Sequence, residues 1–303
     1  MDNKILVAGS INMDVVINVK RLPKKGESVH GETIKYIPGG KGANQAVAAS
    51  RLGAKVAFIG KVGSDNFGNE LLTFLKSENI DTSAVEKSKL PSGMAQITVE
   101  KGGQNTIVIL KGANEEVTEK YVKGWESLIK DSNIVVSQYE IPLPSVKNLF
   151  ELAKKHNKIT ILNPSPAYYT ASDVLRNVDY LVVNENELQV LTSSSAKNLN
   201  VSKIAELAKR LIARGAKVVV VTLGPKGAVA VAKSKIIRSE GLKVDAVDAT
   251  AAGDCFVGAM AVAISNNISL DEALRFANRA AAISVQRRGA SSSLPKLSEV
   301  EIK

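Results

Sequence analysis

The second half of the chain alternates short apolar runs with helical segments, and this alternation constrains the fold most strongly. The apolar runs predict strands at residues 134–137, 159–162, 180–183 and 217–222. Amphipathic helices are predicted between them, notably at 145–156 and 202–214. Such alternation is typical of a doubly wound α/β fold, in which a mainly parallel sheet carries helices on both faces.

Polar or glycine-rich segments follow the predicted strands. They occupy residues 138–140, 163–164, 184–187 and 222–227. In open α/β sheets, ligands bind outside the carboxyl ends of the strands. One such segment is ordinary for a loop, but several that meet at one sheet edge favour a binding site.

The first half is less regular. Strands are predicted at 5–8, 15–17, 28–36 and 55–60, and helices at 41–52 and 68–79. Residues 94–100 and 105–110 predict a hairpin, whose apolar residues alternate as they do in a small, one-faced sheet. We predict a single domain over residues 1–303, with a β lid built from roughly residues 13–38 and 92–110.

Composition excludes several classes of protein. The net charge of +10 comes from scattered lysines without a basic run, so we expect attraction for a polyanionic substrate but no nucleic-acid binding. No apolar stretch approaches the about 20 residues of a membrane span, and the N-terminus does not resemble a signal peptide. One cysteine and two histidines leave little material for a disulfide, a cysteine-based zinc site or a Ser-His-Asp triad. We expect a cytoplasmic enzyme.

Residues 247–260 combine small residues, an acid and a helical apolar pattern. Residues 243–247 predict the end of a strand, and the helix is predicted to begin near Asp254 and to continue to about residue 266. Ala251, Ala252 and Gly253 would leave the first N–H groups of that helix open to an anion. An anion hole beside a carboxylate base is what phosphoryl transfer to a hydroxyl needs. Taken alone, the segment fits a capped helix slightly better, because acids are common in first turns.

Two further segments carry candidate ligand-binding residues. Asn12 and Asp14 share one face of an extended chain and suit the hydroxyls of a sugar, although a turn or a cap explains them equally well. Gly40-Lys41-Gly42-Ala43-Asn44 leads into a helix, and its glycines allow close approach of a ligand. This is not a Walker A loop, because residue 35 is not glycine and no Ser or Thr follows Lys41. No G-x-G-x-x-G fingerprint occurs.

Three widely separated segments resemble the signatures of one family. Residues 39–46 (GGKGANQA) and 248–254 (DATAAGD) resemble the two signatures of the ribokinase-like (PfkB) carbohydrate kinases, and residues 184–187 (NENE) resemble their N-x-x-E element. The resemblance covers the whole chain. It is closest to the ribokinase branch, because Ala-Ala-Gly-Asp replaces the commoner Gly-Ala-Gly-Asp.

The resemblance implies ATP-dependent phosphorylation of D-ribose at its 5-hydroxyl. Asp254 would be the catalytic base, and the N–H groups of Ala251, Ala252 and Gly253 would stabilise the transferring group. The implied sugar site comprises Asn12, Met13, Asp14, Gly40, Lys41, Gly42, Ala43, Asn44, Glu140 and Asp254.

The same resemblance implies the remaining ligands. The nucleotide would contact Asn184, Thr222, Leu223, Gly224, Pro225, Lys226, Gly227, Gly253 and Asn278. Asn184 and Glu187 would act near Mg²⁺, mainly through water. An activating K⁺ would lie among Asp248, Thr250, Ser284, Arg287, Gly289 and Ser293, several of them acting through backbone carbonyls. A homodimer through the lid sheets is also implied, because the small sheet needs cover for its apolar face.

Two alternatives stay open. A kinase for fructose, deoxyribose or adenosine would share the chemistry and differ in the shape of the sugar pocket. A non-catalytic sugar- or nucleotide-sensing protein could share the fold, but we would expect it to have lost the base. Cys255 is either a redox-sensitive thiol or a buried structural one, and its place in the apolar pattern of the helix favours the second.

Overall fold

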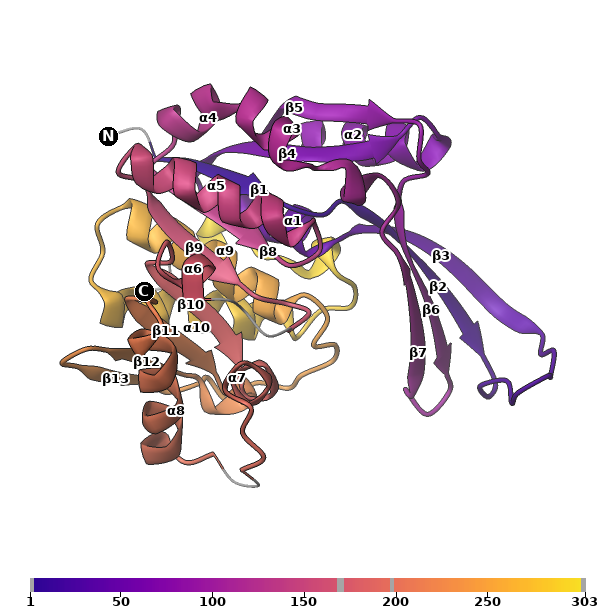
Figure 1. Ribbon diagram of the computed structural model, residues 1–303. Helices are drawn as coiled ribbons and strands as arrows, with labels where there is room; N and C mark the ends of the chain where they lie inside the picture. The colour runs from indigo at the N-terminus through magenta and orange to yellow at the C-terminus, as the bar shows by residue number, and fades with distance from the viewer. Residues whose placement is uncertain (1–2, 168–171, 197–198, 301–303) are drawn as a thin grey trace.

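A nine-stranded sheet runs through the main body of the molecule (Figure 1). It is seen in a computed structural model, which describes residues 3–167, 172–196 and 199–300. Its strands, in spatial order, are β13 (Ile236–Ser239), β12 (Ala228–Ala232), β11 (Val218–Thr222), β10 (Tyr180–Asn184), β9 (Ile159–Asn163), β8 (Ile134–Gln138), β1 (Lys4–Ala8), β4 (Lys55–Gly63) and β5 (Ile80–Ser88). The strands from β11 to β5 are parallel, and β12 and β13 add an antiparallel edge. The predicted fold class is confirmed.

The central strands of the body divide their side chains between two hydrophobic cores. Ile5 and Val7 of β1 enter one core, and Leu6 and Ala8 enter the other. The first core is covered by α1 (Lys41–Arg51), α2 (Asn66–Ser77), α9 (Ala252–Ser265), α10 (Leu270–Ser284) and α11 (Leu297–Val300). The second is covered by α3 (Glu119–Gly124), α4 (Glu126–Asp131), α5 (Leu143–Lys155), α6 (Ser172–Leu175), α7 (Glu185–Thr192) and α8 (Val201–Ala213). Burial on both faces explains why the strands read as uninterrupted apolar runs.

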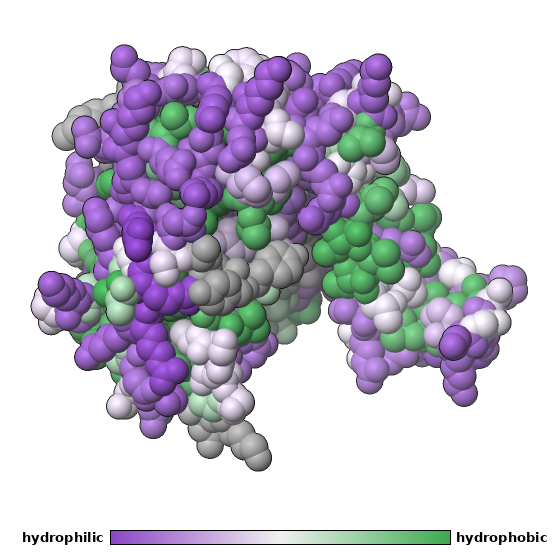
Figure 2. Space-filling view, in the orientation of Figure 1, coloured by the Kyte–Doolittle hydropathy of each residue, from purple (hydrophilic) through white to green (hydrophobic). Residues whose placement is uncertain are grey.

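A second sheet of four strands projects from this body (Figure 1). Its strands are β3 (Gly31–Gly39), β2 (Asn12–Val19), β6 (Gly93–Glu100) and β7 (Asn105–Leu110), in that order. They come from the two segments predicted to form a lid. Large apolar side chains stay exposed on this sheet, and Figure 2 shows hydrophobic surface gathered where it leaves the body. They are Ile34, Tyr36, Ile107, Val108, Ile109 and Leu110.

The structure corrects two details of the prediction. Residues 243–247 are irregular rather than the end of a strand, because the N–H groups of Val247 and Asp248 both donate to Val285 O (2.7 and 3.0 Å), beyond the end of α10. Strand β5, at the edge of the sheet, was not predicted. Its burial pattern mixes exposed and buried positions, so it lacks the apolar run that marks the central strands. Within the described ranges, no helix is long and apolar enough to span a bilayer.

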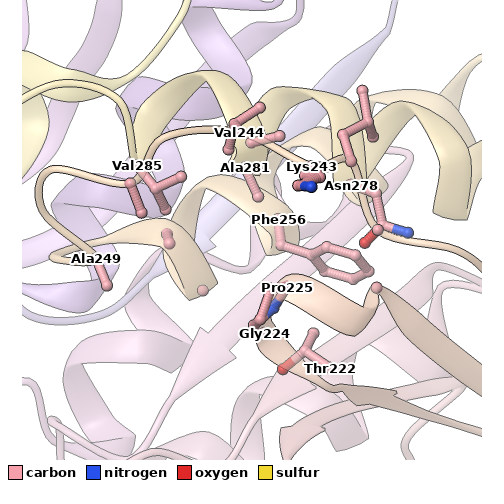
Figure 3. Close-up of a pocket in the computed structure, with 17 residues that line it drawn as sticks. Thr222, Gly224, Pro225, Lys243, Val244, Ala249, Phe256, Asn278, Ala281 and Val285 are labelled. Carbon is pink, nitrogen blue, oxygen red and sulfur yellow. The ribbon is translucent and has the colours of Figure 1, made fainter.

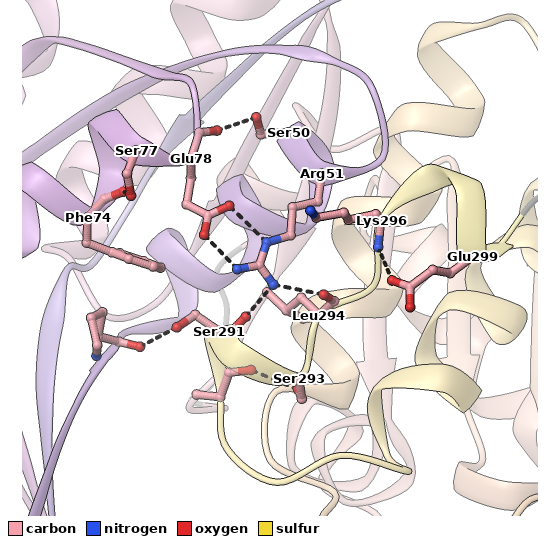
Figure 4. Close-up of polar contacts among 12 residues, drawn as sticks. Ser50, Arg51, Phe74, Ser77, Glu78, Ser291, Ser293, Leu294, Lys296 and Glu299 are labelled. Atoms are coloured by element: carbon pink, nitrogen blue, oxygen red, sulfur yellow. Dashed lines mark hydrogen bonds and ion pairs between the residues drawn. The ribbon is translucent and has the colours of Figure 1, made fainter.

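A half-buried arginine connects helix α1 to the C-terminal loop (Figure 4). The Arg51 guanidinium makes a bidentate pair with Glu78 (2.8 and 2.6 Å) and also donates to Ser291 O and Leu294 O, both at 2.8 Å. Ser291 Oγ in turn donates to Pro38 O at 2.8 Å, near the end of β3. The far end of α1, the C-terminal loop and the root of the projecting sheet are therefore joined.

Candidate active site

The N-terminus of α9 is an open turn of small residues. Ala251 caps the helix in the left-handed region (φ 59°), where alanine is strained and glycine is not. A Cβ added at Gly253 would meet no atom within 4 Å outside its own helical turn, so the space beside the helix end is open. The Ala252 N–H donates to Ala249 O at 3.2 Å, and a bound anion would share or replace that bond. This geometry suits an anion at the positive end of the helix.

Asp254 lies in the next position and is buried. Its Oδ2 accepts from Asn44 Nδ2 (3.1 Å) and its Oδ1 from Gln45 Nε2 (3.0 Å). Burial raises the pKa of this carboxyl, against the opposing charge of Lys41 and the two amide bonds. Helix α1 can pack this close to α9 because residue 258 is glycine: a Cβ there would lie 2.7 Å from Gln45 O. The carboxylate is therefore held between two helices, beside the open turn.

Asn12 and Asp14 lie on strand β2 at the root of the projecting sheet. Asn12 Oδ1 accepts from Asn114 Nδ2 at 2.8 Å, and Asn12 helps to line a cavity of about 130 Å³ that Ile109, Lys111, Asn114, Tyr139, Glu140 and Pro166 complete. Burial, followed by the charges of Glu140 and Asp254, raises the pKa of Asp14 to about 7. Asn12 thus lines a cavity together with Glu140, and Asp14 lies close enough to Glu140 and Asp254 for their charges to act on it.

Lys41 lies among carboxylates from several elements. Burial lowers the pKa of its ammonium, but Asp254, Glu140, Glu187 and Asp14 together outweigh burial and raise it. The Lys41 N–H donates to Glu140 Oε2 at 3.0 Å, and the same oxygen accepts from Ser10 Oγ. One buried acceptor nearby, Asn44 Oδ1, has no hydrogen-bond partner among the residues that the structure describes. A ligand with a hydroxyl group would supply the missing donor.

A cavity of about 430 Å³ lies on the other side of the α9 turn (Figure 3). Of the predicted nucleotide residues it is lined by Thr222, Gly224, Pro225, Gly227, Gly253 and Asn278. Leu223 is buried and Lys226 is exposed, and neither lines it. The remaining wall is mostly apolar and was not predicted: it includes Phe256, Val285 and residues 241–244. A flat aromatic ring fits such a lining.

A polar cavity of about 410 Å³ shares Thr222, Gly224, Ala249 and Gly253 with the apolar one and extends to Asp254 and Lys41. Asn184 and Glu187 line it, and they also form a capping box on α7: Glu187 N–H donates to Asn184 Oδ1 (2.8 Å) and Asn184 N–H to Glu187 Oε2 (2.9 Å). A continuous path therefore leads from the apolar cavity, past the α9 turn, to Asp254.

The six residues predicted for K⁺ are only partly brought together. Asp248 accepts from Thr250 N (2.9 Å), Thr250 Oγ (2.6 Å) and Gly289 N (2.9 Å). Ser284 and Ser293 bond to carbonyls within their own turns. The Arg287 guanidinium pairs with Glu299, so this side chain is engaged elsewhere. Oxygens of the two loops that meet at Asp248 are the groups available to a cation.

The profile of the pfkB family of carbohydrate kinases matches residues 2–297 of the chain. The chain belongs to this family. It is 38% identical to a ribokinase of Staphylococcus aureus over 303 residues, covering 99% of both chains, and 40% identical to a ribokinase of Schizosaccharomyces pombe over 308 residues, covering 98% of this chain and 96% of that one.

Solved structures agree. A ribokinase of Thermotoga maritima superposes with a TM-score of 0.90 at 36% identity, covering 98% of this chain and 97% of that one. An Arabidopsis thaliana ribokinase complexed with ribose and ATP gives a TM-score of 0.93 at 32% identity, covering 99% and 98%. The predicted family is confirmed.

Three residues of this PfkB kinase site were missed from the sequence. Gln45 contacts Asp254, Asn114 holds Asn12, and Ser10 donates to Glu140. Gln45 could have been found, because it follows Asn44 in the first turn of the same helix. No signal marks Asn114, which reaches Asn12 across about one hundred residues of chain. Cys255 is buried, as expected, and burial raises the pKa of its thiol to about 12, so it is a structural thiol.

Proposed function

We infer that this PfkB kinase transfers the γ-phosphoryl group of ATP to D-ribose. One observation carries the inference: Asp254 lies buried where a polar cavity meets an open helix N-terminus, with an apolar cavity beyond it. The ribokinase relatives described above, one of them complexed with ribose and ATP, support ribose as the acceptor.

Asp254 is proposed as the base that takes the proton of the ribose 5-hydroxyl. As the hydroxyl oxygen attacks the γ-phosphorus, the bond to the β-γ bridging oxygen breaks and ADP leaves. General-base assistance of this kind is worth about 10²–10⁴ in rate. The N–H groups of Ala251, Ala252 and Gly253 would stabilise the charge on the transferring group, and alanine provides them as well as glycine does.

The sugar-binding set is proposed to be Asn12, Met13, Asp14, Gly40, Lys41, Gly42, Ala43, Asn44 and Glu140. Carboxylate and amide oxygens accept from sugar hydroxyls, and the unpartnered Asn44 Oδ1 supports such a role. Met13 is fully buried, so its contribution would come from the backbone.

The adenine ring would occupy the apolar cavity, and the phosphates would cross the polar cavity toward Asp254. Mg²⁺ bound to the phosphates would neutralise the charge that develops during transfer. Asn184 and Glu187 would hold it mostly through water, which fits their capping box and the reluctance of Mg²⁺ to lose its hydration. K⁺ would bind at the loops around Asp248, where the backbone of residues 284–293 supplies carbonyls.

The projecting sheet is proposed to act as a lid that excludes water from the sugar. Ile109 of β7 already lines the small cavity beside Asn12. Exclusion of water prevents hydrolysis of ATP in place of transfer. The exposed apolar side chains on the face opposite Asp14, which are Ile34, Tyr36, Val108 and Leu110, support a homodimer in which two lids cover each other.

The function is tested by ADP formation with a panel of ribose, deoxyribose, fructose and adenosine, with and without K⁺. We expect ribose to give the highest kcat/KM and K⁺ to raise the rate. Turnover of another acceptor with none for ribose would overturn the assignment. ADP formation that is independent of any acceptor would show an ATPase instead.

A further inference from the structure

Gln45 is fixed in a chain of buried amides that ends at Asp254. It is 1% exposed, and its Nε2 donates both to Asp254 Oδ1 (3.0 Å) and to Asn163 Oδ1 (3.2 Å). Its Oε1 accepts from Gln138 Nε2 at 2.6 Å. Gln138 and Asn163 are paired in register at the carboxyl ends of the neighbouring strands β8 and β9. Side chains at the ends of two neighbouring parallel strands therefore both bond to the Gln45 amide.

A backbone carbonyl determines which end of the Gln45 amide faces Asp254. Asn163 Nδ2 donates to Val182 O at 3.0 Å, and a carbonyl oxygen can only accept. Asn163 Oδ1 therefore points toward Gln45, where it accepts a hydrogen bond from Gln45 Nε2. If Gln45 flipped, its Oε1 would face two acceptors, Asp254 Oδ1 and Asn163 Oδ1. Contacts at the ends of neighbouring strands therefore hold Gln45 Nε2 in the position from which it donates to Asp254.

We propose that Gln45 is a positioning residue for phosphoryl transfer: it holds the Asp254 carboxylate in its ionised form and in its acceptor orientation. The inference rests on the proposed kinase function. Asn44 also donates to Asp254, but its other amide atom is unpartnered and its proposed role is toward the sugar. Both polar atoms of Gln45 are engaged by protein groups, so its bond to Asp254 does not depend on the substrate.

The charged groups around Asp254 act together with this amide. Lys41 on α1 and Glu187 on α7 line the same polar cavity as Asp254, and the charges of Asp14 on β2 and Glu140 after β8 act on Lys41. None of them is altered by a change at Gln45. A shift in the titration of Asp254 in Gln45→Met, which introduces no charge, would therefore report the amide bond.

The test compares Gln45→Met, which keeps the shape of the side chain, with Gln45→Glu, which replaces the donor by a carboxylate. We expect Gln45→Met to lower kcat by about 10- to 100-fold, the size of one hydrogen bond to a charged group. The KM for ribose should change little. The acidic limb of kcat against pH should rise by roughly one to two pH units. Gln45→Glu should raise it further, because a second carboxylate faces the base.

A second readout does not need turnover. The Asp254 carboxyl carbon, observed by NMR in protein labelled at Asp Cγ and assigned with Asp254→Asn, reports its titration directly. A higher titration midpoint in both Gln45 variants supports the proposal, whichever acceptor the enzyme uses. Asn148→Ala, which alters a buried amide of α5 away from the site, is the control and should change neither readout. An unchanged midpoint in folded Gln45→Met, or in Gln45→Glu if the first variant does not fold, would overturn it.

Discussion

At the scale of single residues, the site depends on one ammonium among several carboxylates. Lys41 is surrounded by Asp14, Glu140, Asp254 and Glu187, and their mutual repulsion is offset only in part. Two of these carboxyls, Asp14 and Asp254, have raised pKa values, with burial as the largest cause. Such values are typical of functional sites, where charge is kept at a cost to stability.

Asp14 gives the site a measurable pH dependence. With its pKa at about 7 in the folded protein, the ionised form that accepts a sugar hydroxyl is lost as the pH falls below 7. We expect the KM for ribose to rise as the pH falls from about 8 to about 6, by up to about tenfold per pH unit below the pKa. The pH dependence should disappear in Asp14→Asn, and a KM that stays flat in the wild type would contradict the role.

The raised pKa of Asp14 has the opposite consequence for stability, because ionisation of this carboxyl destabilises the folded protein. A carboxyl whose pKa is raised on folding binds more protons when folded, so the free energy of unfolding falls as the pH rises from about 4 to about 7. Asp14→Asn should therefore raise the melting temperature more at pH 8 than at pH 5. Thermal unfolding at both pH values checks this, and an equal or smaller gain at pH 8 would count against it.

Gly253 offers a change that affects function without affecting packing. A Cβ there would meet no protein atom within 4 Å outside its own helical turn, and the side chain would stand in the space proposed for the phosphoryl group. Gly253→Val should lower kcat by at least about tenfold, as expected for a blocked oxyanion-type site, with no loss of stability. Turnover kinetics and urea unfolding test the pair of expectations. A stable Gly253→Val variant with full activity would remove the anion hole from this position.

At the scale of elements, helix α1 joins the site to the rest of the fold. Its first turn carries Lys41, Asn44 and Gln45, and its last turn carries Arg51, which holds the C-terminal loop (Figure 4). The β–α alternation predicted most strands and the major helices, because burial on both faces leaves a strong apolar signal. The prediction was wrong for residues 243–247 and missed β5, because an irregular segment and an edge strand carry no such signal.

The prediction of the site was limited in a similar way. Asp254, the glycine turn and the strand ends could be predicted as candidates because they stand in local patterns. Gln45, Gln138 and Asn163 form their network through tertiary contacts, and short-range patterns contain no information about such contacts. The wall of the apolar cavity was not predicted, because its apolar residues look like ordinary core.

Arg51 provides the test at this scale. Arg51→Met removes the bidentate pair with Glu78 and leaves two carbonyls without their donor. Both side chains are largely buried, at 18% and 16% exposure, so we expect a loss of about 2–4 kcal/mol in the free energy of unfolding. Arg210→Met breaks an exposed pair with Glu206 and should cost at most about 0.5 kcal/mol. Equal losses in urea unfolding would contradict the account of the C-terminal loop.

At the scale of the whole molecule, a two-core body carries a projecting sheet on which large apolar side chains stay exposed (Figure 2). Sedimentation should therefore give twice the mass of one chain. Val108, 68% exposed on β7, lies in the proposed interface, and Val108→Glu should shift the equilibrium toward the monomer. Ile268→Glu, in the loop after α9, is the control and should leave the mass unchanged. A monomeric wild type would exclude the proposed dimer.

The central claim is that Asp254 is the base for transfer to ribose. The most direct test measures turnover and ribose binding together in Asp254→Asn, which keeps the shape of the side chain and removes the base. We predict that kcat falls by about 10²–10⁴-fold while ribose binding stays measurable by calorimetry. Turnover close to that of the wild type would contradict the claim.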